Sequence, residues 1–374
     1  MAAEATYLTL LRAGLFPAPV PVEGPGGSTG SATVPTGTLN QAWTIAKKQA
    51  TRGVVGKVML DSGVLPPEAE NAVKKKLLAI AAQNLRLEKV LARSVSALEA
   101  EGIGSVLLKG QGAAACYPDP YSRESGDIDL YTGPENARRA FQTLSKLPDA
   151  VKDEEYSDEG KHSHLTIDGI PVEIHRLSDS LPPKWDCKYQ EIAAECLSKD
   201  YEPIVFDGVT VNTPVPTFNA LFLFNHLWRH FFTEGVGFRQ VCDWTLFLHR
   251  NAGRIDRGRL KGYLDRLSLL RPWQVFGAIA TQTLGLPEDE MPFFEPKYNG
   301  PKYRKKTEKV VRMMLREGNF GHERNEWYEL SRESVTGLIK VFISISRRYL
   351  GLVPVFGRVM LYEYIARIRK RMSR

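Results

Sequence analysis

The chain has 374 residues and a mass of 41.9 kDa, which is enough for two or three domains with a buried core. Its hydrophobic fraction of 43% and charged fraction of 25% exclude wholesale disorder, a collagen-like repeat and a coiled coil. The four cysteines lack Cys-x-x-Cys spacing and indicate neither a zinc cluster nor a disulfide framework. Because no apolar stretch reaches about 18 residues, we expect no transmembrane segment and a cytoplasmic protein.

The net charge of +7 is distributed unevenly along the chain. Residues 301–374 contain 18 Lys and Arg against 7 Asp and Glu, so this region carries +11 and residues 1–300 carry −4. From Phe356 onward, apolar and basic residues alternate as in a basic amphipathic helix. Such a tail suits contact with a polyanion or an anionic membrane surface, or packing on its own domain.

The first hundred residues are predicted to be helical apart from one loop. A short helix is expected over residues 7–15, and proline and glycine predict a loop over residues 17–38. Helical periodicity then covers residues 39–102 with a break at 61–67. It is clearest over 67–101, where apolar residues recur every three or four positions.

The period changes at Gly102, where a small sheet is expected to begin. Strands are predicted at 105–108 and 127–131, with a turn-rich segment at 113–126 and a helix at 134–147. Asp168-Gly169 predicts a hairpin of strands 162–167 and 170–175, and Asp207-Gly208 lies between apolar runs at 204–206 and 209–211. From Thr217, a predicted helix N-cap, the chain is expected to stay helical.

The expected fold class is therefore α+β, with a small mixed β-sheet core flanked by helices. The predicted parts are an N-terminal helical segment with a Pro/Gly-rich loop (1–101), the sheet core (102–213) and a helical C-terminal domain with a basic tail (214–374).

Two aspartates lie in the predicted strand 127–131. Because side chains alternate along a strand, Asp127 and Asp129 share one face and Ile128 and Leu130 share the other. Their Cα atoms should lie about 6.6 Å apart, so the carboxylates can converge on one ion or bridge two. Carboxylates and substrate phosphates are the usual ligands of Mg²⁺. An exposed edge strand would explain the pair without a metal.

A third carboxylate follows from the hairpin register. A two-residue turn at Asp168-Gly169 pairs His164 with Glu173 and leaves Glu173 on the polar face of a strand whose other face is apolar. Glu173 is then a third acidic ligand, a base for an attacking hydroxyl, or half of a surface pair with a histidine. His162, His164 and His175 share this face, and a set of two histidines and Glu173 also fits zinc.

An ordered series of motifs resembles a known family. The series contains Leu107-Leu108-Lys109-Gly110, Tyr117-Pro118-Asp119-Pro120, Arg123, Ser125-Gly126-Asp127-Ile128-Asp129-Leu130, Val172-Glu173-Ile174-His175, His226, His230, Gly237-Phe238-Arg239-Gln240 and Asp243. These residues resemble the bacterial "uncharacterised nucleotidyltransferase" family of the DNA polymerase β-like nucleotidyltransferase superfamily, over most of the chain.

The resemblance implies a nucleotidyltransferase-like core and Mg²⁺-dependent transfer of a nucleoside monophosphate from an NTP to an acceptor that is a protein, RNA, sugar or small molecule. It implies two Mg²⁺ ions held by the catalytic residues Asp127, Asp129 and Glu173. The implied nucleotide-binding residues are Lys109, Gly110, Gln111, Arg123 and Ser125. Residues expected on the acceptor side are His164, His226, His230, Arg239 and Asp243. In the family the turn usually has Gly followed by Gly or Ser, whereas here Gln111 follows Gly110.

Two other functions remain open from the sequence. A catalytically inactive nucleotide- or RNA-binding regulator would keep the fold without turnover, in agreement with the basic C-terminal region. A metal-dependent hydrolase would use the His/Glu face of the hairpin and would leave the two aspartates without a role.

Overall fold

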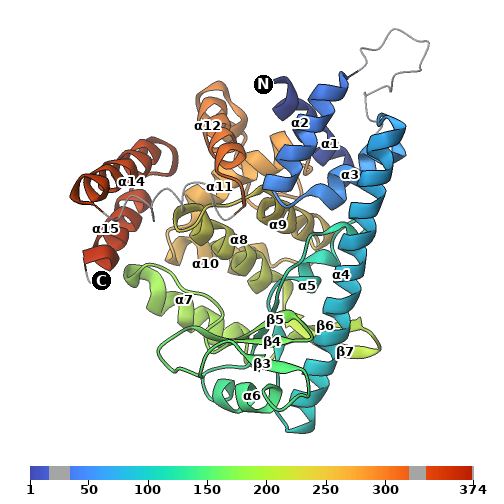
Figure 1. Ribbon diagram of the computed structural model, residues 1–374. Coiled ribbons are helices and arrows are strands. Elements are labelled where there is room, and N and C mark those ends of the chain that lie inside the picture. Colours follow the sequence, from blue (N-terminus) through green and yellow to red (C-terminus); the bar gives the residue numbers. More distant parts are fainter. Residues whose placement is uncertain (17–33, 320–333, 373–374) are drawn as a thin grey trace.

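The computed structural model describes residues 1–16, 34–319 and 334–372. A seven-stranded sheet lies at one end of the molecule and a larger group of helices at the other (Figure 1). The long helix α4 (Pro67–Ala100) runs past both parts, and its first turns carry Glu68 and Glu70, which favour a helix N-terminus.

The other helices have the following bounds. Before α4 come α1 (Ala2–Leu15), α2 (Thr36–Lys48) and α3 (Arg52–Asp61). After it come α5 (Gln111–Ala114), α6 (Ala137–Leu144), α7 (Pro183–Cys196), α8 (Pro216–Phe232), α9 (Phe238–Arg250), α10 (Arg257–Arg266), α11 (Leu270–Ile279), α12 (Pro301–Glu317), α14 (Val335–Phe356) and α15 (Val359–Met372). Short turns of other helix types are η1 (Pro120–Ser122), η2 (Ala280–Leu284) and η3 (Pro296–Asn299).

The sheet is mixed and has the strand order β3-β4-β5-β2-β1-β7-β6. Its strands are β1 (Val106–Leu107), β2 (Ile128–Tyr131), β3 (Ala150–Lys152), β4 (His162–Ile167), β5 (Ile170–His175), β6 (Tyr201–Phe206) and β7 (Val209–Pro214). Strand β2 pairs in parallel with β5 and antiparallel to β1, while β4 and β5 form the predicted hairpin. The central strands are therefore β5, β2 and β1, and they carry the motifs singled out in the sequence.

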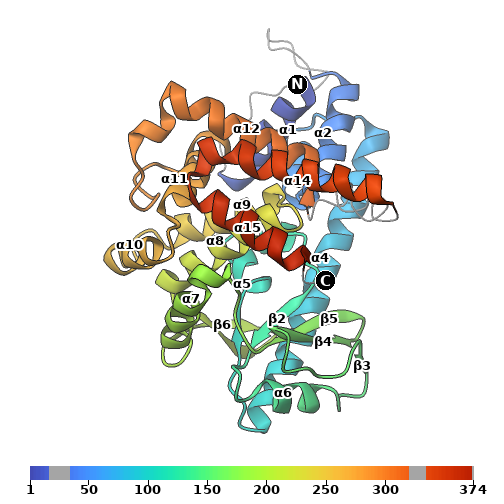
Figure 2. The same ribbon diagram turned by 90° about the vertical axis from the view of Figure 1, so that its left-hand side faces the viewer.

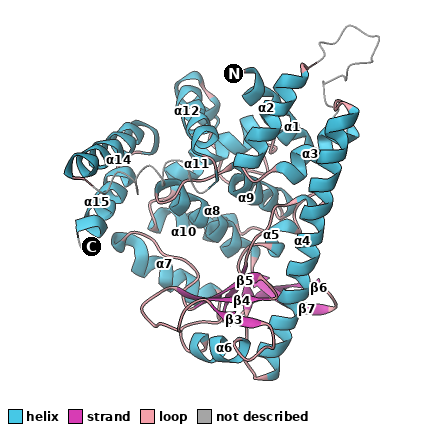
Figure 3. Cartoon of the chain, viewed as in Figure 1, coloured by secondary structure: helices cyan, strands magenta, loops and turns pink. Residues whose placement is uncertain are grey.

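One face of the sheet is apolar and is covered by helices. On this face, the hairpin residues pack in a core with apolar residues of α4 and α6. They are Leu165, Ile167, Ile170, Val172 and Ile174. Figure 3 shows α4 and α6 beside the strands. Because side chains alternate, the opposite face of the same strands carries the polar residues.

A second core holds the helices together. It contains the fully buried Trp228, Trp244 and Trp273, and it joins α1–α3 to the helices that follow the sheet. Aromatic rings meet edge to face in this core, as between Trp244 and Trp273 with ring centroids 4.8 Å apart. Figure 2 shows these helices stacked above the sheet, with α14 and α15 lying across one side.

The predicted α+β class, the helix break before α4 and the hairpin at Asp168-Gly169 are confirmed. The apolar runs on either side of Asp207-Gly208 form a second hairpin, β6–β7. The predicted N-cap Thr217 is wrong: α8 begins at Pro216, whose fixed φ suits the first helical position, and Thr217 Oγ1 instead accepts a bond from the backbone N–H of Asp256. Strand β1 and helix α6 are shorter than predicted, and α7 and β3 were not predicted. Most of the predicted loop at 17–38, namely residues 17–33, lies outside the described residues.

The basic tail forms α15 and packs at least partly on its own chain. Lys184 of α7 lies 3.5 Å from the ring centre of Tyr362, and Tyr364 shares a hydrogen bond with Ser346 of α14. Among the residues that the structure describes, none of the helices is both long and apolar enough to span a membrane.

Candidate active site

Three carboxylates converge on the polar face of the sheet. The parallel pairing of β2 with β5 sets Asp129 directly beside Glu173, and Asp127 lies one residue before β2 on the same face. One oxygen from each of the three lies within 4.8 Å of the others. Asp129 is fully buried, whereas the Asp127 side chain is 38% exposed. The predicted convergence of the three carboxylates is therefore confirmed as geometry.

A lysine and a histidine lie among these carboxylates. Lys109 Nζ is 2.9 Å from Asp129 Oδ2 and 3.3 Å from Asp127 Oδ2. His175 Nε2 is 2.9 Å from Asp129 Oδ1 and 3.1 Å from Glu173 Oε2, and its ring donates because an ionised carboxylate only accepts. The central position of His175 was not predicted, although it shares a strand face with Glu173.

The pKa directions follow from this mixture of charges. Burial alone would lower the pKa of Lys109, but attraction to Asp127, Asp129 and Glu173 outweighs it and raises the pKa. Burial alone would raise the pKa of Asp129 and Glu173, yet Lys109 and His175 hold both pKa values below the usual range. Lys109, Asp129 and Glu173 therefore stay charged at neutral pH.

A glycine turn connects β1 to the short helix α5. Gly110 has a φ of +60°, which favours glycine, and a Cβ there would lie 3.3 Å from the carbonyl oxygen of Asp127. The turn thus passes close to the backbone of the acidic strand. The side chain of Gln111 points elsewhere, because it is buried and donates to Asn84 of α4 at 3.2 Å.

Arg123 and Asp243, which the sequence assigned to opposite sides of the site, form a buried ion pair. The Arg123 Nε and Nη2 groups each donate to one Asp243 oxygen at 2.8 Å, and Nη1 donates to Ser125. The hydroxyl of Tyr117 donates to Asp243 at 2.7 Å. This bidentate arrangement ties the loop before β2 to helix α9.

Replacing Asp243 by asparagine is expected to lower the free energy of unfolding by about 3–5 kcal/mol, because Arg123 would keep a buried charge without its counter-ion. The two side chains are only 6% and 8% exposed. Urea unfolding followed by circular dichroism measures this difference. Asp265→Asn is the control, since its pair with Lys261 is half exposed and worth about 0–1 kcal/mol. Equal midpoints for the two variants would contradict the prediction.

A cavity of about 370 Å³ lies between the acidic strands and helices α8 and α9. Its lining contains Lys109, Arg123, Asp127, Lys161, His162, Glu173, His175, Ser178, Phe222, Leu223, His226, Arg229, His230, Glu234, Arg239, Gln240 and Asp243. Most residues predicted for the site thus line a single cavity. The predicted residues that are not among the lining residues are Asp129, Gly110, Gln111, Ser125 and His164. Of these, Asp129 lies buried behind Lys109, and His164 Nδ1 lies 3.7 Å from Glu173.

A second group of charges beside the cavity was not predicted from the sequence. The fully buried Asp179 lies 2.8 Å from Arg229 Nε and 3.5 Å from Lys161 Nζ. Burial would raise the pKa of Asp179, but these two cations lower it. The sequence offers one signal for Arg229: it lies between the two predicted histidines of α8. Asp179 and Lys161 lie in irregular segments without a motif.

The histidines of α8 lie in the cavity wall as an aromatic stack. His226 stacks on Phe222 and meets His230 edge to face, with ring centroids 4.4 Å apart. Burial lowers the pKa of both imidazoles, so both are neutral at pH 7. Arg239, also predicted for this side, donates to the carbonyl of Glu124 at 2.7 Å. The residues of α8 and α9 that the sequence predicted on the acceptor side therefore line the same cavity as Asp127 and Glu173.

The three carboxylates, a glycine turn beside a short mixed sheet and a helical partner that closes the cavity define a nucleotidyltransferase-like protein. Residues 38–285 match the model of the family described as "uncharacterised nucleotidyltransferase". The match covers well over half of the chain, and the protein belongs to this family. This supports a general nucleotidyltransferase role. Neither a curated protein nor a solved structure matches the chain.

Proposed function

We propose that the protein is a Mg²⁺-dependent nucleotidyltransferase that transfers a nucleoside monophosphate from an NTP to the hydroxyl of an acceptor. The observation that carries the proposal is the convergence of Asp127, Asp129 and Glu173 within 4.8 Å. Asp127 and Glu173 line a cavity whose wall also contains several cations. Family membership supports the reaction class.

The donor set fits Mg²⁺, which prefers oxygen ligands and is usually bound through carboxylates and substrate phosphates. Lys109 already brings a positive charge to Asp127 and Asp129, in keeping with the need of three close carboxylates for cations. Asp127 and Asp129 would hold the Mg²⁺ ion that arrives with the triphosphate, and Glu173 would act on the acceptor side, as the base or as a ligand of the second ion that the resemblance implies. When bound, Mg²⁺ neutralises charge on the triphosphate and on the leaving pyrophosphate.

In the proposed reaction, the acceptor oxygen forms a bond to the α-phosphorus of the NTP while the bond from that phosphorus to the β-phosphate oxygen breaks. Pyrophosphate leaves, and Glu173 takes the proton of the acceptor hydroxyl. Of the cations that line the cavity, Lys109, Lys161 and Arg229 would bind phosphate oxygens. The backbone at Gly110 and Gln111 would approach the triphosphate, since the Gln111 side chain is engaged with α4.

One observation favours a second candidate, a metal-dependent hydrolase. His162, Glu173 and His175 also lie within 4.8 Å of one another. However, both ring nitrogens of His175 are engaged, Nδ1 with the carbonyl of Leu177 at 3.3 Å and Nε2 with two carboxylates. Metal binding by this set would break these bonds, so the carboxylate set is the better site.

Incubation with Mg²⁺, NTPs labelled at the α-phosphate and a cell lysate tests the proposal. We expect label to appear on an acceptor, pyrophosphate to be released, and both signals to disappear with EDTA. Mass spectrometry then identifies the acceptor by the added nucleoside monophosphate. Nucleotide binding without any transfer would indicate the inactive regulator, and Zn²⁺-dependent hydrolysis without transfer would indicate the hydrolase.

A further inference from the structure

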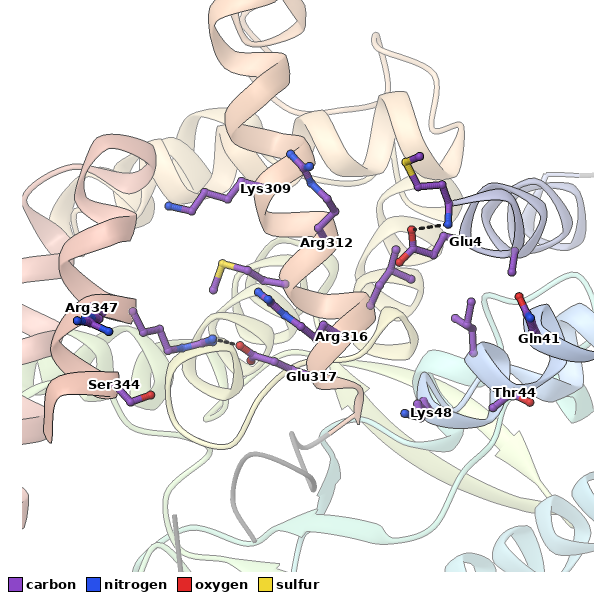
Figure 4. Close-up of a pocket in the computed structure, with 16 residues that line it drawn as sticks. Glu4, Gln41, Thr44, Lys48, Lys309, Arg312, Arg316, Glu317, Ser344 and Arg347 are labelled. Atoms are coloured by element: carbon purple, nitrogen blue, oxygen red, sulfur yellow. Dashed lines mark hydrogen bonds and ion pairs between the residues drawn. The ribbon is translucent and has the colours of Figure 1, made fainter. Parts of the chain in front are cut away.

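A second cavity, of about 1110 Å³, lies among the helices and shares no lining residue with the active-site cavity. Its walls come from α1, α2, α12 and α14. Figure 4 shows α12 in the middle, with α14 on one side and α1 and α2 on the other. We call this cavity the basic groove, because its charged side chains are mostly cationic. They are Lys48, Lys309, Arg312, Arg316, Arg347 and Arg348, against Glu4 and Glu317.

The cations of α12 form a row. Lys309, Arg312 and Arg316 are spaced three and four residues apart, so they share one helix face over a length of about 10 Å. Arg347 extends the row across to α14 (Figure 4). A row of this kind is suited to a ligand with repeated negative charges rather than to a single anion.

The two carboxylates of the basic groove neutralise only part of this charge. Glu317 pairs with Arg348, and Glu4 pairs with the amino group of Met1 at 3.7 Å. Lys309 donates to the carbonyl of Gly351, which carries no net charge. No carboxylate in the described ranges 1–16, 34–319 and 334–372 forms an ion pair with Arg312, Arg316 or Arg347. All three arginines line the groove and are exposed, so a ligand can reach them.

The shape and lining of the basic groove indicate which class of polyanion fits it. A cavity above about 1,000 Å³ exceeds the usual range for small ligands, and its concave form does not match a flat bilayer. The lining residues that the structure describes include no aromatic side chain on which a base could stack. Contacts to phosphates fix a nucleic acid in place without reading its bases. We propose that the basic groove binds the phosphodiester backbone of a nucleic acid without regard to sequence. This activity goes beyond the proposed transfer reaction, because it needs neither an NTP nor a metal.

The test uses the full chain without NTP or metal. Fluorescence anisotropy is measured with labelled RNA and DNA duplexes of one sequence over about 50–200 mM salt, where phosphate contacts dominate the salt dependence. We expect the triple variant Arg312→Ala, Arg316→Ala, Arg347→Ala to bind at least about tenfold more weakly. The slope of log K against log salt should fall in magnitude by about 1 for each lost contact. The matched control Lys89→Ala, Lys146→Ala, Lys199→Ala removes three exposed cations outside the groove and should bind like the unmodified protein.

Three further measurements keep the result interpretable. Circular dichroism checks that the triple variant folds, and replacing the same arginines by lysine should restore most of the binding because the charges return. Binding of either duplex supports the proposal, and the stronger one identifies the kind of nucleic acid. Equal losses in the two triple variants would overturn it. A loss of binding to anionic vesicles with unchanged duplex affinity would also overturn it. Because nucleotide transfer is assayed separately, failure here leaves the proposed reaction untouched.

Discussion

Replacing Asp127 by asparagine is expected to weaken Mg²⁺-dependent NTP binding at least about 100-fold, since even loss of a residue that only supports a metal ligand costs about 10–100-fold. The substitution removes one charge from the set of three carboxylates and keeps the size of the side chain. Of the three carboxylates, Asp127 can be changed with the least effect on the fold, because its side chain is 38% exposed. Isothermal titration calorimetry of an NTP with and without Mg²⁺ measures the effect.

The variant Asp129→Asn should show a similar loss of nucleotide binding together with some loss of stability, because Asp129 is fully buried between Lys109 and His175. Asp149→Asn is the control, since this aspartate lies at the sheet edge in an exposed pair with Arg93. Unchanged Mg²⁺-dependent affinity in both Asp127→Asn and Asp129→Asn would remove the basis for the metal site.

The second large effect is expected at Glu173. Glu173→Gln should keep Mg²⁺–NTP affinity within a few-fold and reduce transfer by about 10²–10⁴-fold, the usual loss when a general base is removed. Glutamine keeps the shape of the side chain and still accepts the bond from His175. A group used only when the acceptor loses its proton affects kcat more than ground-state binding.

Glu154→Gln is the matched control for this variant. Glu154 is half exposed, lies 4.0 Å from the His164 ring and accepts a bond from the His164 backbone N–H, which glutamine can also accept, so the change should leave transfer unchanged. Single-turnover kinetics with saturating NTP separates transfer from binding. Full transfer activity in Glu173→Gln would reduce Glu173 to a structural partner of His162 and His175.

Agreement between sequence and structure is best where local rules are strong. The Asp-Gly turn and the alternation of apolar residues were enough to predict that Glu173 lies opposite His164, on the strand face away from the core. The D-x-D spacing likewise predicted a common face for Asp127 and Asp129. The error at Thr217 also has a local cause: two competing signals for a helix start lie next to each other, and Pro216 occupies the first position.

The sequence by itself determined the α+β class, the central hairpin and the carboxylates, because these depend on periods and turns within a few residues. Only the tertiary structure decided which charges meet. Asp243 pairs with Arg123 across 120 residues, and Asp179 pairs with Arg229 of α8. The basic groove likewise joins α12 to α14 and α2. Such pairs depend on how sheet and helices pack, and a single sequence carries no local signal for that packing, since a charge looks the same whether it faces solvent or a partner.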